Sequence, residues 1–214
     1  MNENLTDITM LLDRSGSMAS IKDDVEGGLK TFVEGQKKAP GEATFSLVQF
    51  DTGAPQEVVH DAVDIQKVPE NVLDFHPRGG TPLLDAMGLS IVRTGDRLRA
   101  MPEDKRPSKV MFVIFTDGYE NASREYTNET VKTLVEKQTE EFKWNFMFLG
   151  ADIDAFGVSR SLGIKDGMTL DLNKNHSAQS YSDLEVLTTT YRTSGDSKSL
   201  HFTDEQRTAA KNDQ

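Results

Sequence analysis

Short apolar runs alternate with longer amphipathic stretches along most of the chain. The apolar runs lie at 8–12, 43–50, 110–115, 144–149 and 168–172, and they have the length and hydrophobicity of buried strands. The segment 57–65 mixes apolar with charged residues, as an edge strand does. This alternation predicts an α/β fold: a doubly wound, mostly parallel central sheet with helices on both faces and one antiparallel edge strand.

The stretches between the strands have apolar side chains three or four positions apart, which is the spacing of one helical face. The first helical pattern begins at Ile21 and stops at the breaker Ala39-Pro40-Gly41. Pro82 fits the first turn of a second helix. Further helical patterns lie at 128–142, 155–162 and 177–191. We expect one domain over 1–192, followed by a loosely held polar tail, 193–214, with a short helix.

Composition narrows the class of protein. The 214 residues are 36% hydrophobic and 28% charged, as in a soluble globular domain. The absence of cysteine excludes disulfides and thiolate metal sites. The net charge of −11 argues against nucleic acid as a partner. Since neither a secretory signal nor an apolar stretch of membrane-spanning length is visible, we expect a cytoplasmic protein with no membrane partner.

The candidate chemistry follows two of the apolar runs. Asp13-Arg14-Ser15-Gly16-Ser17 comes directly after the first strand, and Asp117 follows the run at 110–115. A third segment, Gly79-Gly80-Thr81-Pro82, precedes the second helix. Carboxyl ends of buried parallel strands meet at one edge of a sheet, so we expect these segments to converge. Their donors are all oxygens, which suit Mg²⁺, Mn²⁺ or Ca²⁺ and not softer metals.

These three segments resemble the metal-ion-dependent adhesion site (MIDAS) of von Willebrand factor type A (vWA) domains, of an intracellular prokaryotic or phage-like type. That motif is Asp-x-Ser-x-Ser, then a distant Thr, then a distant Asp. Here it falls on Asp13, Ser15, Ser17, Thr81 and Asp117. The resemblance implies a Rossmann-like fold and metal ligation by the three hydroxyls, with Asp13 and Asp117 binding directly or through water.

The same resemblance implies a function. A MIDAS leaves one coordination position open for a carboxylate from a partner protein, usually an Asp or Glu side chain. We therefore expect a magnesium-dependent protein-binding module without enzymatic activity. Intracellular relatives work beside ATPases, and this chain has no ATPase motif of its own, so an ATPase in such an assembly would be a separate chain.

Other readings of these residues remain open. Asp13 and the two serines suit a simple helix cap. A metal-dependent phosphoryl-transfer enzyme of the HAD type also places an Asp after its first strand, but it requires a second acid where this chain has Ser15. A serine hydrolase lacks support because the Gly-x-Ser-x-Gly motif is missing. Generic phosphatase assays separate the enzyme classes from a binding module.

Overall fold

A computed structural model describes residues 1–211 of the chain. Six strands form one sheet in the order β3-β2-β1-β4-β5-β6. Their bounds are β1 Asn2–Asp13, β2 Glu42–Asp51, β3 Ala54–Asp64, β4 Pro107–Thr116, β5 Asn145–Ala151 and β6 Thr169–Leu172. All neighbouring pairs are parallel except β2 with β3. The predicted mostly parallel sheet with one antiparallel edge strand is therefore confirmed.

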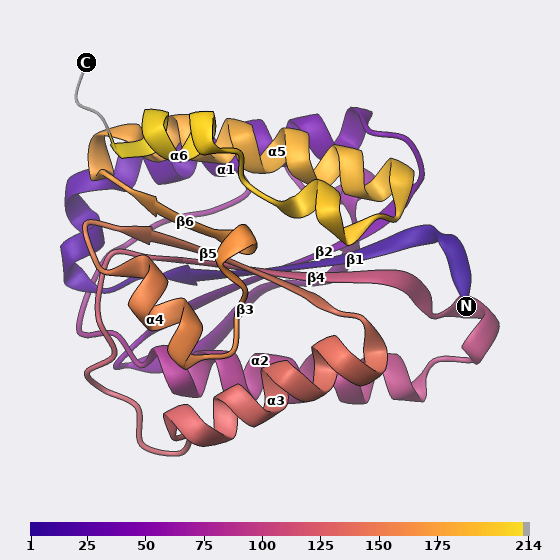
Figure 1. The fold of residues 1–214 in the computed structure, drawn as a ribbon, viewed down its shortest axis with the longest axis horizontal. Coiled ribbons are helices and arrows are strands. Elements are labelled where there is room, and N and C mark those ends of the chain that lie inside the picture. The colour runs from indigo at the N-terminus through magenta and orange to yellow at the C-terminus, as the bar shows by residue number, and fades with distance from the viewer. Residues whose placement is uncertain (212–214) are drawn as a thin grey trace.

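Helices cover both faces of this sheet, as predicted. They are α1 Lys22–Lys38, α2 Leu83–Ala100, α3 Asn128–Phe142, α4 Ala155–Ser161, α5 Ser177–Ser194 and α6 Asp204–Lys211. In Figure 1, α1, α5 and α6 lie on one side, and α2, α3 and α4 lie on the other. The alternating elements thus give three layers, with the most apolar strands in the middle one.

The central strands β1 and β4 are buried on both faces of the sheet. Ile8, Met10 and Leu12 on β1 have no exposed side-chain surface, and the apolar residues of β4 pack beside them. On the face that α1 and α5 cover, Tyr181 of α5 stacks on Phe115 of β4 with ring centres 5.2 Å apart. Tyr181 also lies against Gly28 of α1, where a Cβ atom would collide with its ring. Only glycine lets the two helices approach this closely.

The polar end of the chain differs from the expected loose tail. The short helix is present as α6, but Leu200, Phe202 and Ala210 are buried in the core. The backbone N–H of Asn173 also donates to the carbonyl of Ala210 at 2.9 Å. A few apolar residues in a polar segment therefore suffice to dock it. The last part of the predicted tail, 212–214, lies outside the described residues.

Strand order decides where a site can form. The chain leaves β1 for β2 on one side, and later returns to place β4 on the other side of β1. The chain therefore turns to opposite sides after β1 and after β4, and this is the place where open α/β sheets form their binding sites. Within residues 1–211, none of the helices combines the length and hydrophobicity of a membrane-spanning segment.

Candidate metal centre

The first predicted segment forms a tight turn at the carboxyl end of β1. The Ser15 N–H donates to Oδ1 of Asp13 at 2.7 Å, and the hydroxyls of Ser15 and Ser17 lie 3.1 Å apart. Asp13 and Ser15 are buried, whereas Ser17 is exposed. A 3₁₀ turn, Gly16–Ile21, leads from here into α1. The turn therefore gathers one carboxylate and two hydroxyls at the edge of the sheet.

The adjacent strand brings Asp117 to the same place. Leu12 of β1 is in register with Phe115 of β4, so the residues that follow lie side by side. The Ser17 hydroxyl donates to Oδ1 of Asp117 at 2.6 Å, although 100 positions separate the two residues. Thr116 donates its hydroxyl to Oδ2 of Asp13, also at 2.6 Å. Parallel pairing of β1 with β4 is thus what joins the two acidic segments.

Thr81 approaches from the loop that begins α2. Its side chain is 2% exposed, and its N–H donates to Oδ1 of Asn121 at 2.9 Å. A Cβ atom added to Gly118 would lie 2.6 Å from the Thr81 hydroxyl oxygen and 3.6 Å from Oδ2 of Asp13. These two oxygens therefore face one small space, and Gly118 leaves that space open. All the residues predicted for the site lie within this one region.

Burial perturbs the protonation of Asp13. Burial, which disfavours the carboxylate, raises the pKa of Asp13 to about 6. Hydrogen bonds from Thr116 and Ser15 oppose that shift, and the charge of the neighbouring Asp117 adds to it. A dication placed here would relieve both the burial cost and the repulsion. The electrostatics and the oxygen donors therefore fit the same kind of ligand.

This pKa makes the stability of the metal-free protein depend on pH. The folded state holds the Asp13 proton more tightly than the unfolded chain does. Its free energy of unfolding should therefore fall as pH rises from about 4 to about 6, by up to about 3 kcal/mol. Urea unfolding in chelator, compared between wild type and Asp13→Asn, isolates this contribution. If the difference in free energy of unfolding between the two proteins stayed constant over that pH range, the prediction would be wrong.

Arg14, which lies between Asp13 and Ser15 in the chain, has a role that the sequence did not indicate. It is 5% exposed, and it donates to Asp51 at 2.8 Å, to Gln49 at 2.7 Å and to Glu57 at 2.7 Å. Arg78 also pairs with Asp51, at 3.1 Å. These contacts fasten the loop after β1, and the loop that carries Thr81, to strands β2 and β3.

Asp51 is the centre of that ion-pair network. Burial would raise its pKa, but hydrogen bonds from the Gly53 N–H and from both arginines hold it below the usual value. The pKa of Glu57 is lowered mainly by its hydrogen bond from Arg14. Both carboxylates therefore stay charged and keep the buried guanidinium neutralised. A loop held this firmly presents its serines in one position.

A second network fixes the loop after β4 against α2. The carboxylate of Asp85 accepts the N–H groups of Arg124, Glu125 and Tyr126 at 2.8 to 2.9 Å. Glu120 accepts the N–H of Leu84 at 2.9 Å. These bonds hold the loop that follows Asp117 beside the start of α2, and so they set the distance from Asp117 to Thr81. Neither residue shows a motif that would reveal this role from sequence.

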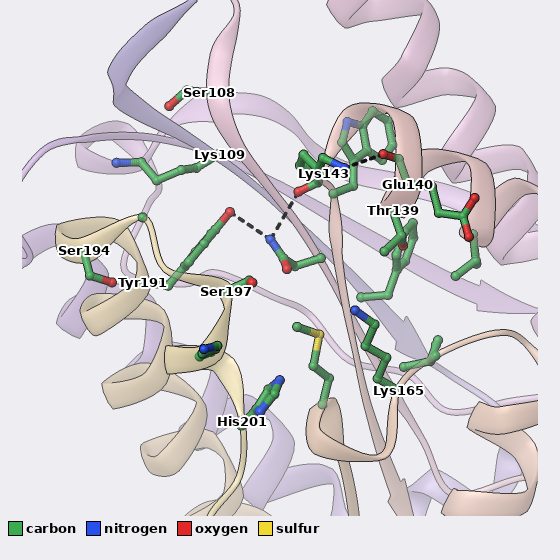
Figure 2. A pocket seen from close by; sticks show the side chains of 18 of the residues that line it. Ser108, Lys109, Thr139, Glu140, Lys143, Lys165, Tyr191, Ser194, Ser197 and His201 are labelled. Atoms are coloured by element: carbon green, nitrogen blue, oxygen red, sulfur yellow. Dashed lines mark hydrogen bonds between the residues drawn. The ribbon is translucent and has the colours of Figure 1, made fainter.

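A cavity also lies at the opposite edge of the sheet. It measures about 940 Å³ and is lined by Lys109, Lys143 and Lys165 among others. Figure 2 shows Tyr191 in it, whose hydroxyl accepts a 2.8 Å hydrogen bond from Asn145. Lys109 and Lys143 donate to backbone carbonyls there, two of which belong to the last turns of helices. These lysines satisfy helix ends, and the cavity has no part in the candidate site.

The donor set differs from the usual metal clusters of proteins. Among residues 1–211, no three His, Cys, Asp or Glu residues gather as a metal-binding group. The candidate site instead has two carboxylates, and its other donors are hydroxyls. That composition suits a hard cation such as Mg²⁺. The candidate set was predicted from the sequence through its resemblance to a MIDAS, whereas the supporting Thr116, Asn121 and Arg14 required the fold.

Comparisons with known proteins agree with this architecture. No protein-family model matches the chain, and no curated protein sequence matches it. Solved structures do match, among them the von Willebrand factor type A protein from Catenulispora acidiphila, at TM-score 0.62 and 13% identity over 86% of this chain and 42% of that one. Manganese-loaded TRAP from Plasmodium vivax matches at TM-score 0.58 and 13% identity, over 84% and 72% of the two chains.

A third structure, the vWF domain of the pilus tip protein Mfa5 from Porphyromonas gingivalis, matches at TM-score 0.60 and 11% identity over 84% of this chain and 93% of that domain. In several matched structures this chain spans less than half of the matched protein. At identities this low, the structural similarity establishes the fold and not the chemistry. The chain has a von Willebrand factor type A-like fold.

Proposed function

We propose that this protein is a binding module that uses a divalent cation to hold a carboxylate of a partner protein. The hydroxyls of Ser15, Ser17 and Thr81 and the carboxylates of Asp13 and Asp117 would hold Mg²⁺, with Mn²⁺ and Ca²⁺ as alternatives. The 2.6 Å bond from Ser17 to Asp117 carries the proposal, because it places a hydroxyl of the first segment directly on the carboxylate of the other.

The chemistry of the donors explains the choice of partner. Hydroxyls are neutral ligands, so the cation keeps Lewis acidity toward an incoming anion. An Asp or Glu side chain on the partner would supply that anion. The vWA-like folds found in Mfa5 and TRAP agree with a binding role, and the bound manganese of TRAP agrees with the metal. A separate ATPase chain is one source of the partner carboxylate.

Magnesium-dependent capture of an acidic peptide tests the proposal. The probe is a blocked glycine-rich peptide with one glutamate, and its control is the same peptide with glutamine. We expect NMR shift changes at the Asp13 and Asp117 loops only for the glutamate peptide and only with Mg²⁺ present. Equal binding of both peptides, or binding that survives chelator, would refute the mechanism.

A further inference from the structure

A lysine reaches into the candidate metal centre. The ammonium nitrogen of Lys174 lies 2.8 Å from Oδ2 of Asp117, whose side chain has no exposed surface. Within residues 1–211, this Oδ2 has no hydrogen-bond partner. The contact is therefore an ion pair that lacks the alignment of a hydrogen bond. Oδ2 is consequently an acceptor whose bonding capacity is still available to another cation.

The backbone around Lys174 holds the ammonium in this position. Lys174 begins a 3₁₀ turn, Lys174–His176, that joins β6 to α5. Its N–H donates to Oδ1 of Asp152 at 3.2 Å, and its carbonyl accepts the Ser177 hydroxyl at 2.7 Å. The lysine side chain is only 23% exposed. Its charge is therefore delivered by a fixed loop rather than by a freely moving surface residue.

The charges in the site give this contact a consequence. A dication bound by Asp13 and Asp117 would compete with the Lys174 ammonium for the carboxylate of Asp117. Two cations on one carboxylate lie close together and repel each other. Once the dication is bound, the two carboxylates, the ammonium and the metal carry a net positive charge. Without the lysine, the carboxylates would neutralise the metal. An incoming carboxylate is therefore attracted more strongly when Lys174 is present.

We propose that Lys174 is a tethered cation with two opposite effects: it weakens divalent-metal binding and strengthens the binding of an acidic partner by the loaded site. This inference rests on the proposed function and adds a specificity-determining residue to it. A purely structural ion pair would lower stability when it is broken, but it would not shift the two affinities in opposite directions.

The test compares wild type with Lys174→Met, which keeps the length of the side chain and removes its charge. Mn²⁺ affinity is measured by calorimetric titration, and the glutamate peptide is titrated into Mg²⁺-saturated protein by NMR. We expect Lys174→Met to bind Mn²⁺ about tenfold more tightly and the peptide several-fold more weakly. Lys174→Arg should behave as wild type.

Lys165→Met is the matched control. Lys165 is exposed and lines the cavity at the opposite edge of the sheet, so this variant makes the same change in net charge far from the site. It should change neither affinity. If wild type binds Mn²⁺ and Lys174→Met binds it equally or more weakly, the inference is overturned and the proposed function still stands. No metal binding by any variant would overturn both, whereas binding by Lys174→Met alone would support the inference.

Discussion

Asp117→Asn is expected to weaken Mn²⁺ binding by more than about 100-fold. Loss of an outer partner of a metal ligand already costs about 10- to 100-fold, and here a charged ligand itself is lost. Asparagine keeps the shape of the side chain, and its amide oxygen still accepts the Ser17 hydroxyl. The variant should therefore fold normally. Calorimetric titration with Mn²⁺, together with unfolding in chelator, measures both properties.

Asp104→Asn provides the control for this charge change. Asp104 is exposed and lies between α2 and β4, at the edge of the sheet away from the site. Its substitution should leave Mn²⁺ affinity within about twofold of wild type, because exposed charges at that distance are screened by salt. If Asp117→Asn bound Mn²⁺ as wild type does, Asp117 would not be a ligand and the proposed centre would be wrong.

Asp51→Ala is expected to lower the free energy of unfolding by about 3 kcal/mol. The Asp51 side chain is 1% exposed and pairs with Arg14 at 2.6 Å. Removing one partner of a buried pair leaves the other charge without compensation. The alanine variant also loses the acceptor for the N–H groups of Gly53 and Ala54. Urea denaturation, followed by circular dichroism, gives the change directly.

Glu57→Gln distinguishes burial from simple charge pairing. Glu57 also binds Arg14, but its side chain is 46% exposed, so its loss should cost less than about 1 kcal/mol. Because Asp51 anchors the loop that carries Ser15 and Ser17, Asp51→Ala should also weaken Mn²⁺ binding in protein that is still folded. Equal destabilisation by the two variants would show that the network is not organised around Asp51.

Several elements could be predicted because their signals are local. The runs in β1 and β4 are apolar at nearly every position, and a run of that pattern and length is typical of a strand buried on both faces. The helix that became α3 shows its buried positions at helical spacing. The limits of elements differ from the predicted ones. β1 begins at Asn2, six positions before the apolar run, because strand pairing with β2 and β4 extends into polar residues.

The polar end of the chain shows the opposite case. Its composition predicted a loose tail, yet Leu200 and Phe202 are buried. Their segment packs on β6 and α5, and these contacts exist only after the sheet has formed. The division into a domain at 1–192 and a tail, and the cytoplasmic location, remain predictions.

The sequence by itself predicted the fold class, from the alternation of apolar runs with helical patterns. It also supplied the candidate oxygen donors, from their places after the strands and their resemblance to a MIDAS. Only the tertiary structure decided what surrounds those donors. The register of β1 with β4 set Thr116 on Asp13, strands β2 and β3 enclosed Arg14, and the turn after β6 brought Lys174 to Asp117. These contacts join positions far apart in the chain, and no periodicity in the sequence records which distant charges will meet.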